Sequence, residues 1–356
     1  MEIKRPKVVF LFSNERTLAY TAVTEGKNHS AGFWGMMDLP RYGVDATFLE
    51  IEQFFPVGLV KFFRKNINVY HIHALFFPAL FTYDIIYTSA AFGTQLIHML
   101  YPFRKPIWIM HDFSIASMIG EGKTPKQRLF RFMTARSGGI VTLSEEEAVR
   151  LRQLFPHLAG RIVCIPFGAD LAFFKPNMLE KKNTVFAVGR DPDRDWDTLI
   201  GIAPEIPAEV LIATHERRVA HLRPLPSNVT AGQFSVEDLI RHYQEAKVFV
   251  LPLDTSNGLN DAMGCSALYE ALALGKAIVA TDTHTMRSYI TDGVNGLLVP
   301  EGHSQALISA IQRLLEDKAL RNKYENASRL YAEEHLDLNK QTHKLATFFK
   351  ELLMNI

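Results

Sequence analysis

The sequence predicts an α/β protein made of two Rossmann-like domains, each with a doubly wound parallel sheet. Short apolar, β-branched segments alternate with helical segments, which is typical of parallel sheets covered by helices on both faces. The 356 residues are enough for two hydrophobic cores. A polar, proline-containing segment, Leu171–Asn183, separates two such series of strands and helices, so we expect it to be the linker.

The first series fills roughly the first half of the chain. The predicted strands are Lys7–Ser13, Val44–Glu50, Val69–His73, Asp84–Thr88, Pro106–Met110, Gly139–Leu143 and Arg161–Pro166, and the predicted helices are Phe33–Arg41, Val57–Arg64, Ala91–Leu100, Pro125–Ala135 and Ser144–Leu154. The segment Asn14–Ala31 is polar and has no period. We expect it to be a loop at the carboxyl end of the first strand, a position that faces ligands in such sheets.

The second series begins with a predicted strand at Thr184–Gly189. Further strands are predicted over Val210–Thr214, Asn228–Gly232, Val248–Leu253 and Ala277–Thr281, with helices over Val236–Ala246 and Gly264–Leu274. Asp254–Asp261 is rich in polar residues and reads as a loop. Three helices complete the chain, and the last, Leu338–Met354, carries an apolar stripe.

Composition excludes several classes of protein. A net charge of +1 gives no electrostatic footprint for nucleic acid, so we expect no nucleic-acid partner. The sequence contains no apolar stretch of about 18 residues for a membrane span, and the opening MEIKRPKVVFLFS lacks the pattern of a signal peptide. Two cysteines, Cys164 and Cys265, are too few for a disulfide framework and suit a reducing compartment. We therefore expect a cytoplasmic protein.

The predicted helix Gly264–Leu274 has two features of an anion-binding site. It begins near the carboxyl end of a predicted parallel strand, where backbone N–H groups can bind phosphate. Glu270 lies one to two turns from that N-terminus, away from the apolar face made by Leu268 and Leu272. A nucleoside diphosphate needs N–H groups for its phosphates and a carboxylate for its ribose hydroxyls. Taken alone, the helix still favours an ordinary surface glutamate.

The run Tyr269–Thr281, YEALALGKAIVAT, resembles the second half of the donor-site signature of the retaining family 4 glycosyltransferases. In that signature a loop with Glu-Gly-Phe-Gly precedes Glu-Ala and Gly-Lys-Pro-Val-Val-Ala-Thr. The first signature glutamate falls on Ala262 here, and the loop before it holds Asn260 and Asp261. The resemblance covers nearly the whole chain and is strongest from Lys247 to Val299. It implies the GT-B fold, with two Rossmann-like domains facing across a cleft, and transfer of a sugar from a nucleotide-diphosphate sugar with retention of anomeric configuration.

The resemblance also implies the site residues. Arg190, after a predicted strand, matches a family arginine and Arg194 takes the place of a family lysine, so both would bind the diphosphate. Glu270 would bind ribose, and His111, at the end of another strand, would contact the donor sugar. The catalytic candidates are thus His111, Arg190, Arg194 and Asp261, and the further donor-site candidates are Gly189, Gly232, Phe234, Asn260, Met263, Gly264, Cys265, Ser266, Ala267 and Glu270. The alternative for the two arginines is an ordinary surface pair that balances nearby aspartates.

In the resembled family the last helix crosses back to the first domain. We therefore expect residues 1–172 and 338–356 to form an acceptor-side domain and residues 173–337 to form the domain that binds the nucleotide sugar. The acceptor would be a glycan, a lipid-linked molecule or a small molecule. No metal or other cofactor is expected, because arginines and a helix N-terminus can carry the diphosphate charge.

Two other functions fit the same signature. A nucleotide-sugar epimerase-like enzyme on this fold would need acid and base carboxylates from both domains. An inactive nucleotide-sugar-binding scaffold is suggested by Ala262, where the family has its first glutamate.

Possible metal ligands form a separate question. Asp191-Pro192-Asp193 follows a strand and could hold Mg²⁺ or Mn²⁺ on a diphosphate. His71 and His73 would share one face of a predicted strand, where core or interface histidines are favoured over a metal site. We favour a site without metal.

The predicted helix Pro125–Ala135 is basic and amphipathic. Lys126, Arg128 and Arg131 alternate with apolar residues along it. This pattern is compatible with weak peripheral contact with a membrane surface. A surface helix packed on the sheet is the favoured alternative.

Overall fold

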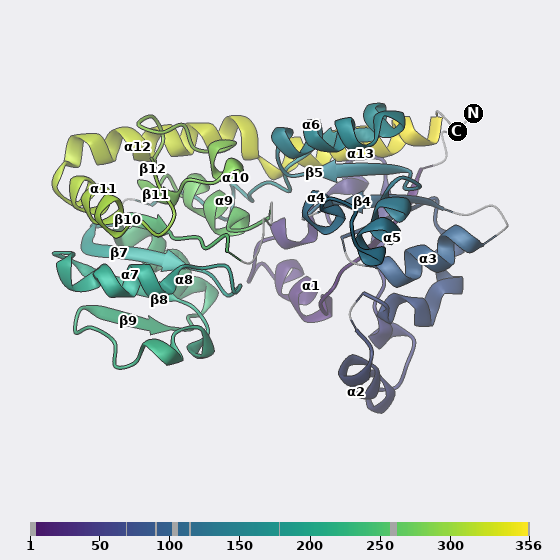
Figure 1. The fold of residues 1–356 in the computed structure, drawn as a ribbon, viewed down its shortest axis with the longest axis horizontal. Helices are drawn as coiled ribbons and strands as arrows, with labels where there is room; N and C mark the ends of the chain where they lie inside the picture. Colours follow the sequence, from purple (N-terminus) through teal and green to yellow (C-terminus); the bar gives the residue numbers. More distant parts are fainter. Residues whose placement is uncertain are drawn as a thin grey trace. The chain divides into compact units, whose positions relative to one another are not determined.

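A computed structural model describes residues 5–68, 70–89, 91–101, 106–113, 115–177, 179–256 and 262–354. The chain divides into two compact units (Figure 1). Unit 1 comprises Met1–Phe167 and Leu338–Ile356, and unit 2 comprises Gly168–Asp337. The boundary falls after Phe167, a few residues before the segment that the sequence predicts to be the linker.

The sheet of unit 1 has six parallel strands in the order β2-β1-β3-β4-β5-β6. The strands are β1 Lys7–Leu11, β2 Asp45–Phe48, β3 Ile85–Thr88, β4 Ile107–His111, β5 Gly139–Thr142 and β6 Ile162–Cys164. Most of their residues are buried, as expected for parallel strands covered on both faces. All six carboxyl ends therefore meet at one edge of the sheet.

Two layers of helices cover the sheet of unit 1. The helices are α1 Thr17–Thr24, α2 Val57–Asn66, α3 Phe92–Leu100, α4 Ile115–Ile119, α5 Pro125–Thr134, α6 Glu145–Leu154 and α13 Leu338–Met354. Helices α2, α4, α5 and α6 contribute to the core on the face of Val9 and Ile86. Helix α13 packs its apolar stripe, including Leu345 and Phe349, on the opposite face.

Unit 2 repeats this architecture with the strand order β12-β11-β10-β7-β8-β9. The strands are β7 Lys182–Val188, β8 Glu209–Ala213, β9 Val229–Gly232, β10 Ala246–Leu251, β11 Ile278–Thr281 and β12 Leu297–Val299, and the helices are α7 Trp196–Ile202, α8 Val236–Glu245, α9 Cys265–Ala273, α10 His284–Arg287, α11 Ser304–Glu316 and α12 Lys318–Tyr331. All of its strand pairs are parallel. The alternation read from the sequence thus yields two doubly wound sheets.

One predicted strand is wrong. His71 and His73 do not alternate on a strand, because the chain forms a 3₁₀ helix over Ile72–Thr82. This helix contains Pro78, which has no N–H for a sheet ladder. The His73 ring is buried and its Nε2 lies 3.0 Å from the carbonyl oxygen of Phe12, so it is a core histidine.

The segment after β1 also differs from the prediction. The expected helix Phe33–Arg41 is replaced by two short 3₁₀ helices, Ala31–Phe33 and Leu39–Tyr42. Between them Trp34 and Gly35 have φ angles of +53° and +81°, which no right-handed helix accommodates. The expected loop Asn14–Ala31 contains helix α1. Because none of the residues of α1 is buried, its sequence lacks the periodic apolar residues that would have predicted a helix.

No helix in the described part of the chain combines the length and the apolar character needed to cross a bilayer.

Candidate functional site

The candidate site of unit 2 lies where the strand order of its sheet reverses. From β7 the chain adds β8 and β9 on one side, and then β10, β11 and β12 on the other. The carboxyl ends of the parallel neighbours β7 and β10 therefore diverge into loops on opposite sides at the same edge. Ligands of doubly wound sheets bind at such a switch point. Gly189 and Arg190 follow β7 directly, and helix α9 follows β10.

Arg194 connects the segment after β7 with the segment after β10. Its Nε donates a hydrogen bond to the carbonyl oxygen of Val188 (3.1 Å), and its Nη1 lies 3.2 Å from a carboxylate oxygen of Asp191. Its backbone pairs with Leu253, just beyond β10. The side chain is buried, and burial lowers the pKa of the guanidinium while the Asp191 carboxylate opposes that change. Since Nη2 makes no hydrogen bond with the described residues, it can still donate to a ligand.

Gly189 makes room for this arginine. A Cβ atom at Gly189 would lie 2.1 Å from Nε and 2.7 Å from Cγ of Arg194, distances that atoms cannot adopt. The guanidinium can therefore cross the end of β7 only because residue 189 has no side chain. Arg190 is exposed, and its carbonyl oxygen accepts a hydrogen bond from Nε of Arg218 (3.0 Å), which fixes the loop backbone at this point.

Gly264 is the N-cap residue of α9. Its φ of +75° is the left-handed conformation that glycine adopts most readily. A Cβ atom there would also lie 3.1 Å from Leu251 and 3.3 Å from Leu253. The first turn of a helix has N–H groups without intrahelical acceptors, and here these belong to residues such as Ser266 and Ala267. Ser266 is exposed, whereas Met263, Cys265 and Ala267 are buried. The positive end of the helix dipole and these N–H groups together favour an anion.

Glu270 is half-buried on the same helix, and its carboxylate accepts a hydrogen bond from the Tyr243 hydroxyl (3.0 Å). Burial raises the pKa of Glu270 to about 7. The Tyr243 hydrogen bond and the charges of Arg190 and Arg194 act in the opposite direction, so both arginines lie within electrostatic range of the carboxylate. The sequence did not reveal Tyr243 as a partner of Glu270.

Gly232 and Phe234 follow the third strand along the same edge. The Gly232 carbonyl oxygen accepts from the backbone N–H of Thr214 (2.9 Å), and the Thr214 hydroxyl donates to the carbonyl oxygen of Gly189 (2.6 Å). This chain of hydrogen bonds connects the ends of β9, β8 and β7. The Phe234 ring is half-buried and packs edge-on against His242, with ring centroids 4.7 Å apart.

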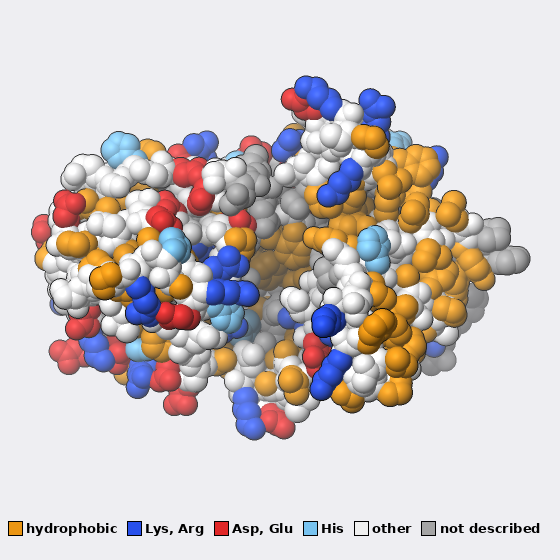
Figure 2. Space-filling view, turned by 60° about the horizontal axis from the view of Figure 1, so that its bottom comes forward, with side chains coloured by type: hydrophobic (Ala, Val, Ile, Leu, Met, Phe, Trp, Pro, Cys, Tyr) orange, Lys and Arg blue, Asp and Glu red, His pale blue; other side chains and the backbone are white. Residues whose placement is uncertain are grey.

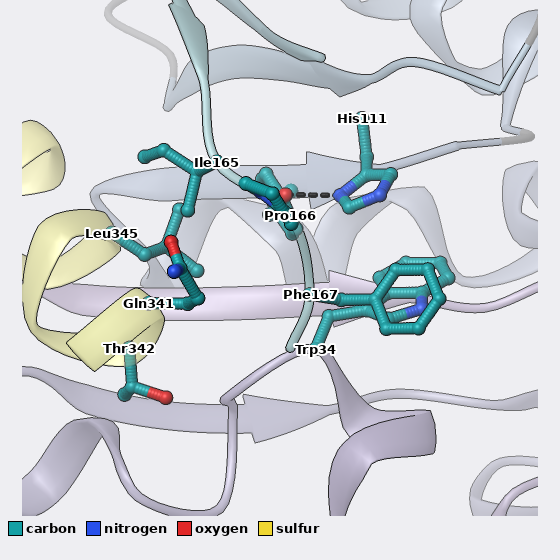
Figure 3. Close-up of a pocket in the computed structure, with 9 residues that line it drawn as sticks. Trp34, His111, Ile165, Pro166, Phe167, Gln341, Thr342 and Leu345 are labelled. Carbon is teal, nitrogen blue, oxygen red and sulfur yellow. Dashed lines mark hydrogen bonds between the residues drawn. The ribbon is translucent and has the colours of Figure 1, made fainter. Parts of the chain in front are cut away.

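His111 ends β4 in unit 1 and lines a pocket there (Figure 3). Its ring is 2% exposed and stacks on Trp34, with centroids 4.6 Å apart and an interplanar angle of 17°. Its Nδ1 is hydrogen-bonded to the Tyr87 hydroxyl. Burial lowers the pKa of His111 to about 3, so the ring is neutral at physiological pH. The rest of the pocket is lined by Ile165, Pro166, Phe167, Gln341, Thr342 and Leu345.

The Nε2 atom of His111 is buried and has no hydrogen-bond partner among the described residues. A buried polar atom without a partner is costly, which suggests that a ligand or water satisfies it. Sequence reasoning missed Trp34. The feature that singles out Trp34 is its backbone conformation, because it is the non-glycine residue with a positive φ among the described residues. Such a strained conformation often marks a functional site.

The structure brings together Gly189, Arg190, Arg194, Glu270 and the N-terminus of α9, all in unit 2, and leaves His111 in unit 1. Asn260 and Asp261 lie outside the described residues. Cys265 is buried and forms no disulfide with a described residue. Among the described residues no cluster of three or more His, Cys, Asp or Glu side chains is arranged to hold a metal ion.

A comparison with known protein families matches the part of the chain that carries this candidate site. Residues 171–331 match the family model of the glycosyl transferases group 1. The chain resembles the group 1 glycosyltransferases. The predicted resemblance is confirmed, and the match covers nearly all of unit 2, including every donor-site candidate assigned to it.

Several curated glycosyltransferases match parts of the chain. A D-inositol 3-phosphate glycosyltransferase of Geodermatophilus obscurus is 28% identical over 244 residues, which are 58% of this chain and 52% of the relative. The amylovoran biosynthesis glycosyltransferase AmsK of Erwinia amylovora is 34% identical over 84 residues, which are 23% of this chain and 20% of the relative. The chain thus spans about half or less of the length of these two relatives.

Solved structures match over the whole chain. Sucrose-phosphate synthase from Thermosynechococcus elongatus has a TM-score of 0.75 at 18% identity, and Anabaena Alr3699/HepE in complex with UDP-glucose has a TM-score of 0.71 at 15% identity. Each match covers 99% of this chain and 100% of the other. At such identities the likeness concerns the fold, and it confirms the predicted class of two Rossmann-like domains with doubly wound parallel sheets.

Proposed function

We propose that the protein transfers a sugar from a nucleotide-diphosphate sugar to an acceptor with retention of anomeric configuration. One observation carries this proposal: at the switch point of the unit 2 sheet, Arg190 and Arg194 interact electrostatically with Glu270, and Arg194 also with Cys265 in the first turn of α9. Two cations and a row of N–H groups suit a diphosphate, and a carboxylate beside them suits the ribose hydroxyls. The family match of unit 2 and a solved neighbour in complex with UDP-glucose support the same assignment.

The arginines would act on the leaving group. When the bond between the anomeric carbon and the diphosphate oxygen breaks, negative charge develops on that oxygen. Arg190 and the Nη2 group of Arg194 would stabilise this charge together with the N–H groups of Ser266 and Ala267. Such preorganised charges are usually the largest contribution to catalysis. Because these groups carry the diphosphate charge, the proposed reaction needs no metal ion or other cofactor.

The acceptor would attack the face from which the diphosphate leaves. The acceptor oxygen forms the new bond to the anomeric carbon, and its proton goes to the departing phosphate oxygen, so configuration is kept without a protein nucleophile. This route suits a site whose first signature glutamate is replaced by Ala262. The neutral His111 ring, with its unpartnered Nε2, would hydrogen-bond a sugar hydroxyl.

The Asp-x-Asp metal hypothesis has less support. The Asp191 carboxylate accepts hydrogen bonds from the backbone N–H of Asp193 (3.2 Å) and from Arg194, so it is already used within the loop. Asp195 caps α7 through the N–H of Thr198 (3.0 Å). Asp191 and Asp195 thus accept hydrogen bonds from the protein itself.

The test begins with a thermal-shift panel of nucleotide sugars that includes UDP-glucose, because a bound donor stabilises the folded protein by mass action. The donor that gives the largest shift is then incubated with glycan, lipid-linked and small-molecule acceptors, and free nucleotide is measured. NMR of the product should show the donor's anomeric configuration. An inverted product contradicts the proposed route, and an isomerised free sugar nucleotide selects the epimerase-like alternative. Donor binding without nucleotide release from any acceptor selects the scaffold.

A further inference from the structure

The two units carry charges of opposite sign. Unit 1 contains 22 lysine and arginine residues and 14 aspartate and glutamate residues, whereas unit 2 contains 17 and 24. The net charge of the whole chain, +1, hides this difference. A basic unit in a chain whose other unit is acidic indicates that unit 1 meets a negatively charged partner or surface.

Helices α2, α3 and α5 of unit 1 contain no aspartate or glutamate. Helix α3 has no lysine or arginine, whereas α2 and α5 carry six cations: Lys61, Arg64, Lys65, Lys126, Arg128 and Arg131. Among the described residues only Arg64 of these six forms an ion pair, with Glu52. The other five cationic side chains are exposed and form no ion pair with a described residue.

The same three helices expose large apolar side chains. On α2, Val57 is 71% and Phe62 is 58% exposed, and Leu100 at the end of α3 is 78% exposed. Leu59 of α2, Ile97 of α3 and Leu129 and Phe132 of α5 are each at least 40% exposed. The guanidinium of Arg136 lies 3.7 Å from the centroid of the Phe132 ring. Exposed apolar groups in this density usually mark an interaction surface.

These helices belong to one layer of unit 1. Val60 of α2 and Phe130 of α5 join the same core on one face of the sheet, and the ring of Phe92 in α3 lies 4.7 Å from that of Phe130. All three helices therefore cover the same face of the sheet, and α3 and α5 are direct neighbours. Figure 2 shows hydrophobic side chains gathered on the right-hand part of the surface, which belongs to unit 1, with basic side chains beside them. We call the exposed residues of α2, α3 and α5 the apolar-basic face.

We propose that the apolar-basic face binds the surface of an anionic lipid bilayer. Apolar side chains would enter the boundary of the acyl chains, and the lysines and arginines would meet lipid phosphates, as on interfacial amphipathic helices. A symmetric contact between two copies of this face is disfavoured, because it would bring unneutralised cations together. The proposal extends the single basic helix predicted from the sequence to three helices. It concerns binding alone and does not depend on the transfer reaction.

The test is co-sedimentation of the full chain with vesicles of phosphatidylcholine containing 30% phosphatidylglycerol, compared with pure phosphatidylcholine. We expect binding to the anionic vesicles at low salt, and much weaker binding at about 0.5 M NaCl, because salt screens the charges. Each surface cation contributes about fivefold to binding. The variant Lys126→Gln/Arg131→Gln should therefore bind about 25-fold more weakly.

Replacement of apolar groups tests the second half of the proposal. Leu59→Ser/Phe62→Ser should reduce binding about tenfold or more, because both exposed side chains would leave the bilayer boundary. Leu330→Ser and Lys318→Gln on α12 of unit 2 are matched controls, since Leu330 is 64% exposed and Lys318 is exposed outside the face. Both controls should bind as the wild type does.

Three outcomes would overturn the proposal: equal binding to neutral and anionic vesicles, no binding to either, or equal losses in the α12 controls and in the face variants. Size-exclusion chromatography of the wild type and Leu59→Ser/Phe62→Ser distinguishes a protein occupant. A wild-type dimer that becomes monomeric in this variant, without vesicle binding, would assign the face to a second copy. Thermal unfolding of each variant shows that a loss of binding does not reflect loss of the fold.

Discussion

The raised pKa of Glu270 gives donor binding a specific pH dependence. Ribose hydroxyls donate hydrogen bonds best to the ionised carboxylate, so the proposed site binds the donor when Glu270 has lost its proton. With a pKa of about 7 in the free protein, the apparent Kd varies as 1 + 10^(pKa − pH). This expression falls about tenfold between pH 6 and pH 8. Donor affinity should therefore rise about tenfold over that range.

The assay is isothermal titration calorimetry with the donor selected by thermal shift. A nucleotide sugar is preferable to a free nucleoside diphosphate, because both of its phosphates are esterified and neither titrates near neutrality, whereas a terminal phosphate titrates near pH 6. Glu270→Gln should weaken binding about 10–100-fold through the loss of hydrogen bonds to a charged acceptor. It should also abolish the pH dependence between pH 6 and pH 8.

Tyr243→Phe is the matched control for the cause of the pH dependence. The Tyr243 hydroxyl donates to the Glu270 carboxylate at 3.0 Å and so stabilises its ionised form. Its removal should raise the pKa of Glu270 further and move the midpoint of the binding curve to more alkaline pH. A pH dependence that persists in Glu270→Gln, or a wild-type affinity that is flat from pH 6 to pH 8, would refute the assignment of Glu270 to the ribose.

Further predictions concern the same site. The pKa of Glu270 in the folded protein lies above the ordinary value of 4.5, so the folded state loses on the order of 2 kcal/mol of stability as pH rises through 7 and the buried carboxyl group ionises. Glu270→Gln has no such group. Urea unfolding should therefore show this variant gaining stability relative to the wild type from pH 5 to pH 8. Equal pH profiles of the two proteins would contradict this. Gly189→Ala should displace Arg194 and lower turnover at least as much as Arg194→Ala, while Gly201→Ala, with open space around its Cβ position, should leave turnover unchanged. Arg190→Ala and Arg194→Ala should each reduce kcat about 10²–10³-fold, the scale of a lost oxyanion donor, and wild-type turnover in either variant would exclude that residue from the reaction. Activity should survive EDTA, and a complete loss that Mn²⁺ restores would move the diphosphate charge onto a metal.

The sequence by itself determined the fold class, and it predicted most of the candidate residues that the structure brings together in unit 2. Parallel strands buried on both faces must be short apolar runs, so the local pattern reveals them without knowledge of their neighbours. Gly189 and Arg190 follow such a strand directly, and the helix that carries Glu270 is the next helix after another such strand. Their proximity follows from topology, because the carboxyl ends of parallel strands meet at one edge of a sheet.

Tertiary structure alone decided features that depend on contacts between distant residues. The sequence gives no sign that Tyr243 donates to a carboxylate 27 positions later, or that Trp34 stacks on His111. It also misassigned the residues around His73, since a buried apolar run fits a strand and a 3₁₀ helix equally well. The sequence also did not show that Phe62 is exposed, because this depends on α2 packing on the core through Val60. In each case a local pattern shows that a side chain is apolar or ionisable, but the partner that buries it, orients it or shifts its pKa is supplied by another part of the chain.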